Sequence, residues 1–155
     1  MKKIIALVIS MMMLLLAVGC GGGDEKKADG DKKITMGFSQ IGAESEWRTA
    51  NTESVKEAAK AAGIDLQFSD AQQKQENQIK AIRSFIAQGV DVIAFVPIVE
   101  TGWDTVLKEA KDAKIPVIIV DRDLKVEDDS LYVAKIGTNM ITEGEKGFEW
   151  LAKYA

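Results

Sequence analysis

Residues 92–120 read VIAFVPIVETGWDTVLKEAKDAKIPVIIV, and this stretch decides the fold. It opens with five consecutive apolar residues ended by Pro97 and closes with four more at 117–120. Apolar runs without alternation are typical of central parallel strands that are covered on both faces. Between them, apolar residues recur at helical spacing: Trp103, Val106, Leu107 and Ala110. The segment Thr101–Asp104 resembles a capping box, so the stretch predicts a strand, a helix and a second, parallel strand.

The same unit recurs on both sides of this stretch. Apolar periodicity and glycine stops predict strands over residues 34–39, 65–69 and 132–136 and helices over residues 47–62, 75–88 and 142–154. The first helix is expected to bury Val55, Ala58, Ala59 and Ala62. The first four strands begin about 25–31 residues apart, which is the length of a βαβ unit. We therefore predict an α/β fold built on a doubly wound parallel sheet, with ligands bound at the carboxyl ends of its strands.

The composition excludes several classes of function. The chain has 155 residues, one Cys, no His and a formal net charge of −4. Without His there is no Ser-His-Asp or Cys-His catalysis, and one Cys allows neither an internal disulfide nor a Cys-clustered zinc site. The negative charge argues against a nucleic-acid partner, and no Gly-rich phosphate loop follows the first strand. We expect a binding protein with no metal and no cofactor, and not an enzyme.

The amino terminus has the pattern of an export signal. Two lysines precede an apolar stretch over residues 4–18 that only Ser10 interrupts, and the single Cys follows at Cys20. This stretch is too short to span a bilayer, and the Cys stands where a lipobox places it. An ordinary cleaved signal with a chance Cys is the alternative. We predict a lipoprotein signal peptide over 1–19, lipid attachment at Cys20, a flexible tether over 20–32, and an extracytoplasmic domain anchored to the cell membrane.

The segment after the first strand carries side chains suited to a sugar. Its candidate ligand-binding residues are Glu44, Ser45, Glu46, Trp47 and Arg48. Aromatic rings stack on the C–H faces of sugars, while carboxylates and guanidinium groups bond their hydroxyls. The alternative is that Trp47 is a core residue and that Glu44 and Arg48 form a solvated pair on the helix surface.

Two further segments follow the carboxyl ends of predicted strands. Asp121 and Arg122 come directly after Val120 and pair a hydrogen-bond acceptor with a rigid, forked donor. Their alternative interpretation is a surface ion pair that opens an acidic loop. Asp70–Gln73, after the second strand, is at least as well explained by a turn and helix cap as by ligand contact.

A family resemblance rests on five segments: residues 38–48, 72–80, 85–91, 101–103 and 120–122. Together they resemble the sugar-binding proteins of ABC importers, of the ribose/galactose periplasmic type, and its galactofuranose-binding members in particular. The resemblance implies a type I clamshell of two α/β lobes joined by a three-segment hinge, with a monosaccharide between the lobes and an ABC permease as partner. It also implies sugar contacts for Glu44, Ser45, Trp47, Arg48, Asp121 and Arg122, whereas Glu46 stands at the variable place of the motif.

Members of this family are considerably longer than this chain. We therefore expect an amino-terminal sugar-binding lobe over 33–136, followed over 137–155 by the hinge crossing and first helix of a truncated second lobe. One lobe leaves most of a sugar in water, so its own affinity is expected to be about millimolar or weaker.

Other functions remain open at this stage. A binding protein that feeds a chemoreceptor or a sensor kinase would have the same sequence features. A sugar-responsive repressor would need a helix-turn-helix before Ile34, where this chain has an export signal. A glycosidase would need an organised pair of carboxylates, which Glu44 and Glu46 do not by themselves provide.

Overall fold

Strands and helices alternate along the chain in the order that the sequence predicts. The computed structural model describes residues 33–154, so the predicted signal peptide, Cys20 and the tether lie outside the described residues. The elements are β1 (Thr35–Gln40), α2 (Glu46–Ala61), β2 (Asp65–Asp70), α3 (Gln75–Gln88), β3 (Val92–Phe95), α4 (Asp104–Asp112), β4 (Val117–Val120), the short 3₁₀ helix η1 (Asp129–Leu131), β5 (Ala134–Ile136) and α5 (Met140–Tyr154).

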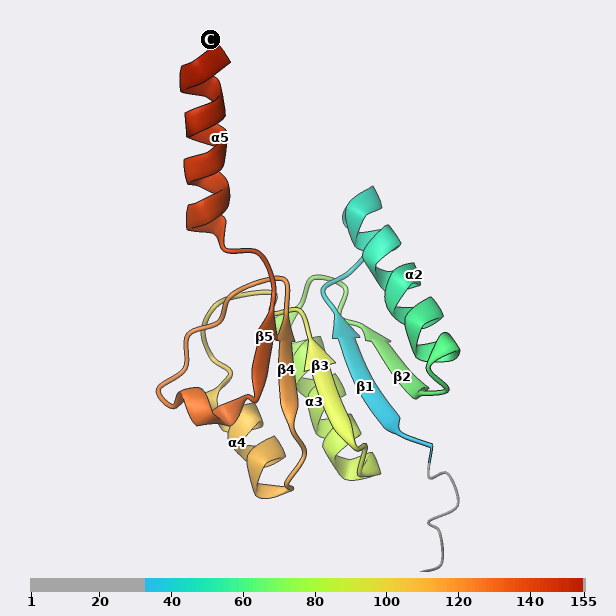
Figure 1. Cartoon of the computed structure of the whole chain (residues 1–155). Coiled ribbons are helices and arrows are strands. Elements are labelled where there is room, and N and C mark those ends of the chain that lie inside the picture. Colours follow the sequence, from blue (N-terminus) through green and yellow to red (C-terminus); the bar gives the residue numbers. More distant parts are fainter. Residues whose placement is uncertain (1–32, 155) are drawn as a thin grey trace, which may run out of the picture. The chain divides into compact units, whose positions relative to one another are not determined.

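The five strands form one parallel sheet in the order β2-β1-β3-β4-β5 (Figure 1). The predicted doubly wound α/β architecture is confirmed. The strand order reverses at β1, which pairs with β2 on one side and with β3 on the other. Ligands of doubly wound sheets bind outside the carboxyl ends of the strands at such a reversal. A ligand-binding site is therefore expected at the loops after β1, β3 and β4.

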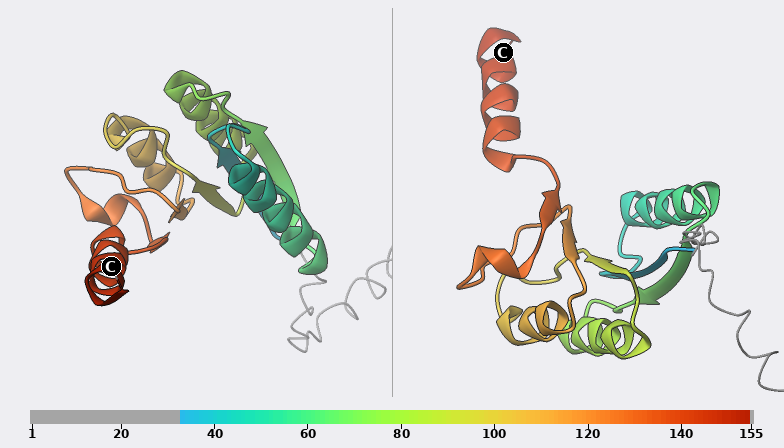
Figure 2. Two further views of the ribbon diagram at one scale, coloured as in Figure 1. Left: turned by 90° about the horizontal axis from the view of Figure 1, so that it is seen from above. Right: turned by 60° about the horizontal axis from the view of Figure 1, so that its bottom comes forward.

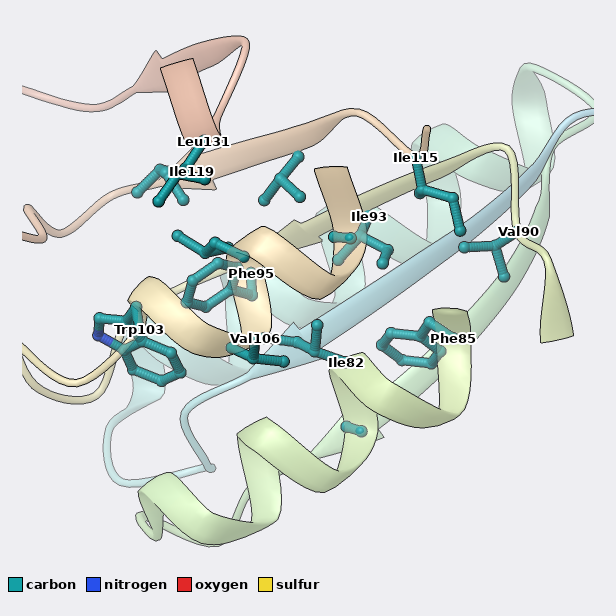
Figure 3. Packing of buried hydrophobic residues seen from close by; sticks show 14 residues of the cluster. Ile82, Phe85, Val90, Ile93, Phe95, Trp103, Val106, Ile115, Ile119 and Leu131 are labelled. Carbon is teal, nitrogen blue, oxygen red and sulfur yellow. The ribbon is translucent and has the colours of Figure 1, made fainter. Parts of the chain in front are cut away.

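Helices α3 and α4 cover one face of the sheet, and α2 lies on the other (Figure 2). The first face holds the main apolar core, in which Ile82, Phe85, Phe95 and Trp103 are buried (Figure 3). Buried Gln78 of α3 donates to the carbonyl of Val96 at 2.7 Å and accepts from the N–H of Ile98 at 3.1 Å. This side chain ties the loop after β3 to the core.

The α2 face is less completely covered than we predicted. Its buried cluster comprises Phe38, Ile41, Ala94 and Val96. Of the four residues expected to be buried, only Ala59 is; Val55 is half-buried, and Ala58 and the C-cap residue Ala62 are exposed. The apolar periodicity correctly predicts a helix. However, α2 packs against the edge strand β2, so only a narrow face of the helix is covered.

The predicted capping box before α4 is wrong. The helix begins at Asp104, and its N-cap is Trp103, whose side chain makes no capping bond. The Trp103 indole is instead fully buried and donates to the carbonyl of Val99 at 2.8 Å. Asp104 accepts from the N–H of Glu127 at 2.9 Å, so it holds the loop after β4. Burial of a large ring outweighed the local capping signal.

No residue of α5 is buried. Its large apolar side chains are all at least half exposed: Met140, Ile141, Phe148, Trp150, Leu151 and Tyr154. Among residues 33–154, no helix is both long and apolar enough to cross a membrane.

Candidate ligand-binding site

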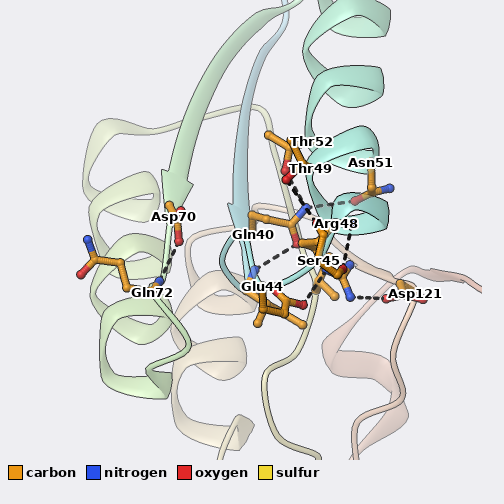
Figure 4. A network of polar contacts seen from close by, with 12 residues as sticks. Gln40, Glu44, Ser45, Arg48, Thr49, Asn51, Thr52, Asp70, Gln72 and Asp121 are labelled. Atoms are coloured by element: carbon orange, nitrogen blue, oxygen red, sulfur yellow. Dashed lines mark hydrogen bonds and ion pairs between the residues drawn. The ribbon is translucent and has the colours of Figure 1, made fainter.

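The loop between β1 and α2 is held by a buried glutamine at the end of β1. Gln40 accepts from the N–H of Ile41 at 3.0 Å and donates to Asn51 at 3.0 Å and to Thr52 at 3.1 Å (Figure 4). The bonds to Asn51 and Thr52 connect the carboxyl end of β1 to the second turn of α2. The sequence pattern gives Gln40 no distinct role, because polar residues recur along β1 at Thr35, Ser39 and Gln40.

Ser45 starts α2 and has a capping role. Its hydroxyl oxygen accepts from the backbone N–H of Arg48 at 3.1 Å, and the helix begins at Glu46, one residue before the predicted start. One lone pair is committed to this cap, so any ligand contact of Ser45 would use the hydroxyl hydrogen or the second lone pair.

Arg48 is the centre of the cluster. Its side chain is only 4% exposed, although it carries a full charge. Nε donates to Glu44 at 3.1 Å, and Nη2 donates to Asp121, in the loop after β4, at 2.8 Å (Figure 4). Buried charges persist where they are paired and hydrogen-bonded in this way. The alternative of a solvated surface pair is therefore wrong for Arg48.

The third nitrogen of the Arg48 guanidinium is different. Nη1 is buried and has no hydrogen-bond partner among the described residues. A buried donor left unsatisfied costs roughly 1–3 kcal/mol, and more when it is charged. Nη1 thus offers a strong, oriented donor for an acceptor atom that the chain itself does not supply.

Trp47 is 57% exposed, which contradicts its interpretation as a core residue. The Arg48 guanidinium carbon lies 4.8 Å from the centroid of the Trp47 ring, a cation–π distance. The indole is therefore held beside the buried cation while much of its surface faces solvent. An apolar ring displayed next to charged hydrogen-bonding groups suits a ligand with both C–H faces and hydroxyls.

Asp121 and Arg122 border a cavity of about 280 Å³. It is lined by Pro97, Ile98, Val99, Glu100, Asp121, Arg122, Asp123 and Met140. This volume is near the lower end of the ~300–1,000 Å³ of small-molecule sites. In the described part of the chain, the ion pair of Asp121 is made with Arg48, so the predicted alternative of a surface pair opening an acidic loop is wrong for this residue.

Glu44 is kept ionised by its surroundings. Burial by itself would raise the pKa of its carboxyl, but hydrogen bonds from its own N–H and from Arg48 lower it, as do the charges of Arg48 and Arg122. The net effect places the Glu44 pKa below its ordinary value of 4.5. At neutral pH the Glu44 carboxyl group is therefore ionised and acts as a hydrogen-bond acceptor.

Two other sequence candidates lie apart from this cluster. Glu46 is exposed in the first turn of α2, and no hydrogen bond or ion pair within residues 33–154 joins it to Arg48. At the end of β2, Asp70 accepts from the N–H of Gln72 at 2.7 Å, and both Gln72 and Gln73 have positive φ. The predicted turn is confirmed, but the predicted helix cap is wrong, because the N-cap of α3 is Lys74 and its side chain makes no capping bond. Across the described residues, no group of three or more acidic side chains is placed to hold a metal ion.

Comparison with known proteins identifies the family. The family described as "Periplasmic binding protein domain" matches residues 36–155. The galactofuranose-binding protein YtfQ of Escherichia coli (strain K12) is 55% identical over 77% of this chain and 38% of its own length. The periplasmic component of the arabinose ABC transporter of Shewanella sp. ANA-3, solved with α- and β-L-arabinofuranose, is 63% identical, with a TM-score of 0.75 over 77% of this chain and 40% of that one.

A protein of Mycobacterium smegmatis, solved in complex with β-D-fucofuranose, is 57% identical, with a TM-score of 0.74 over 77% of this chain and 40% of that one. The chain spans less than half the length of each of these three proteins. Its parallel sheet and flanking helices have the type I fold of such binding proteins. The chain belongs to the periplasmic binding protein family.

Proposed function

We propose that this chain is the amino-terminal lobe of an extracytoplasmic sugar-binding component of an ABC importer, and that its ligand is a neutral monosaccharide in the furanose form. The three relatives described above are named for, or were solved with, galactofuranose, arabinofuranose and fucofuranose. The proposed contacts are Glu44, Ser45, Trp47, Arg48, Asp121 and Arg122, with Glu46 as a peripheral candidate.

One observation carries the proposal: the unpartnered Nη1 of buried Arg48, at the carboxyl edge of the sheet beside the strand-order reversal. Arg48 is already balanced by Glu44 and Asp121. Its free nitrogen therefore does not demand an anionic ligand, and a hydroxyl or ring oxygen suffices. The carboxylates can in turn accept sugar O–H groups, because each has lone pairs beyond its bond to Arg48.

Trp47 would supply the apolar part of recognition. Its exposed indole stands next to Arg48, so a sugar ring lying on it would bring its hydroxyls toward the guanidinium and carboxylates. Ring stacking of this kind and charge-assisted hydrogen bonds favour a small, neutral polyol.

Export and anchoring form a separate part of the proposal. The pattern around Cys20 supports cleavage after residue 19 and acylation of the new amino terminus. Residues 20–32 would then connect the lobe to the membrane, where an ABC permease would receive the sugar. Delivery to a chemoreceptor or sensor kinase is the second candidate for the partner.

The test is an NMR titration of the ¹⁵N-labelled chain with L-arabinose, D-galactose and methyl β-D-galactopyranoside, whose ring is locked in the six-membered form. We expect saturable shifts of the Arg48 Nε–H and Trp47 indole N–H signals with the first two sugars, at total concentrations well above millimolar because only a small fraction of each free sugar is furanose. The locked pyranoside should give much smaller shifts. Arg83 of α3 forms an exposed ion pair with Glu109 of α4, away from the site. Its signal is the internal control and should not respond.

Two outcomes would count against the proposal. Equal responses of Arg48 and Arg83 would indicate a nonspecific solvent effect of the sugar. A response to the pyranoside as strong as that to the free sugars would remove the furanose assignment while leaving sugar binding in place.

A further inference from the structure

Asp121 has an unusual backbone conformation. Its φ is 66°, in the left-handed region that residues with a side chain rarely adopt. The N–H of Arg122 donates to the carbonyl of Val120 at 2.8 Å, which closes a three-residue γ-turn around Asp121. A γ-turn with positive φ at its central residue is the rare, strained form. Such a conformation persists only where the surrounding structure holds it.

The segment that follows β5 supplies this hold. The N–H of Asp121 donates to the carbonyl of Ile136 at 2.7 Å, which continues the β4–β5 ladder beyond the pairing of Val120 with Ile136. Gly137 then lies directly against the Asp121 backbone. A Cβ atom at Gly137 would be 2.7 Å from the Asp121 carbonyl oxygen, 3.2 Å from its carbon and 3.3 Å from its Cα.

These are backbone atoms, which cannot swing aside as a flexible side chain does. Any residue other than glycine at position 137 must displace either the segment after β5 or the Asp121 turn. The two glycines of α5 are in a different situation, because a Cβ at Gly144 or Gly147 would meet nothing within 4 Å. Glycine is therefore needed at position 137 because the backbone there lies too close to the Asp121 backbone to leave room for a Cβ atom.

Displacing the Asp121 turn would also disturb Arg48. The Asp121 carboxylate lies 2.8 Å from Nη2 of Arg48, which it orients together with Glu44. A continuous series of contacts thus runs from Gly137 through the Asp121 turn to the guanidinium whose Nη1 has no partner in the described chain.

We propose that Gly137 is a positioning residue for this site: its missing side chain lets the segment after β5 hold Asp121 in the γ-turn that orients Arg48. The consequence for sugar affinity rests on the function proposed above, whereas the effect on Arg48 does not.

The test compares Gly137→Ala with two control variants of the full chain. Gly144→Ala adds the same methyl group where there is space. Leu107→Ala removes a fully buried side chain of α4 and so lowers stability without touching the site. In the sugar-free protein, Gly137→Ala is expected to shift or broaden the Arg48 Nε–H signal and to speed hydrogen exchange at the Asp121 amide. Neither control should alter the Arg48 signal, even though Leu107→Ala lowers the unfolding free energy.

Sugar titration of the same variants separates the two proposals. If the unmodified chain binds sugar, Gly137→Ala should bind it about tenfold more weakly, the equivalent of one charge-assisted hydrogen bond. If it does not, the signals of the sugar-free protein still decide the role of Gly137. An unchanged Arg48 signal in Gly137→Ala would overturn the proposal.

A measurement on the unmodified chain covers the case in which Gly137→Ala does not fold. The φ-sensitive backbone coupling constant of Asp121 should be that of a left-handed residue, and its amide should exchange slowly because it is bonded to Ile136. A coupling constant typical of an extended or right-handed residue, or a rapidly exchanging amide, would overturn the proposal by itself.

Discussion

Nη2 of Arg48 lies 2.8 Å from Oδ2 of Asp121, and this ion pair joins the first turn of α2 to the loop after β4, through residues that are 73 positions apart in the chain. The two segments follow β1 and β4, two strands that are not neighbours in the sheet. A salt bridge across that distance, with an arginine only 4% exposed, fixes the relative positions of the two halves of the site.

Arg48→Met should destabilise the lobe as well as abolish sugar binding. Methionine fills much of the same volume but leaves Glu44 and Asp121 without their cation. Each loses a charge-assisted hydrogen bond, so we expect a loss of about 2–3 kcal/mol in the free energy of unfolding. Denaturant unfolding measures it, with Arg83→Met as the control: the pair of Arg83 with Glu109 is exposed to solvent, so its loss should change the free energy of unfolding much less. Equal losses in the two variants would contradict the buried role of Arg48.

The stability of the lobe should depend on pH through Glu44. Its pKa is lower in the folded chain than its ordinary value of 4.5, so the folded state binds this proton less readily than the unfolded state. The ion pair with Arg48 therefore contributes fully above that ordinary value and is lost as the pH falls through the lowered pKa. Unfolding followed as a function of pH should show this decline, and Glu44→Gln should flatten it. An identical pH dependence in the variant would show that other carboxylates are responsible.

Trp47→Ala should weaken sugar binding by more than about 1 kcal/mol, the scale of an aromatic anchor in a binding site. Because the indole is mostly exposed, the unfolding free energy should change by no more than about 0.5 kcal/mol. Trp150→Ala is the matched control, since Trp150 of α5 is similarly exposed but belongs to no part of the site. A lower free energy of unfolding with unchanged sugar affinity would indicate that Trp47 has a structural role instead.

Cys20→Ser should move the exported protein from the membrane fraction to the soluble fraction. If the proposed signal peptide is removed, acyl chains on Cys20 would provide the anchor, because residues 20–32 have almost no apolar side chains. Fractionation of cells that express each form, with detection by antibody, measures the distribution. A variant that stays with the membrane would contradict the lipoprotein assignment.

The elements with the strongest local patterns were predicted best. Helix α3 spans Gln75–Gln88 as expected, because its isoleucines recur at helical spacing and Gly89 ends it in the left-handed conformation. Strand β4 also has the predicted bounds, since an unbroken apolar run next to Pro116 admits little else. In these two elements the apolar pattern and the neighbouring Gly or Pro indicate the same bounds, and the structure has those bounds.

The site was predicted less completely, because much of it depends on contacts between distant segments. The motif placed Glu44, Arg48 and Asp121 at the carboxyl edge, and all three meet there. Sequence spacing could not show that Arg48 is buried between two carboxylates, nor that Asp121 has positive φ next to Gly137. Gln40 was missed for the same reason, since its role comes from two partners on α2.

A crystal structure of the chain grown with L-arabinose would show whether a sugar binds at Arg48. We predict the sugar ring on the indole of Trp47, with one of its oxygens within hydrogen-bond distance of Arg48 Nη1. Hydroxyls of the same sugar should donate to Glu44 or Asp121. A sugar bound elsewhere on the lobe, or bound sugar with Nη1 of Arg48 still unpartnered, would contradict the account.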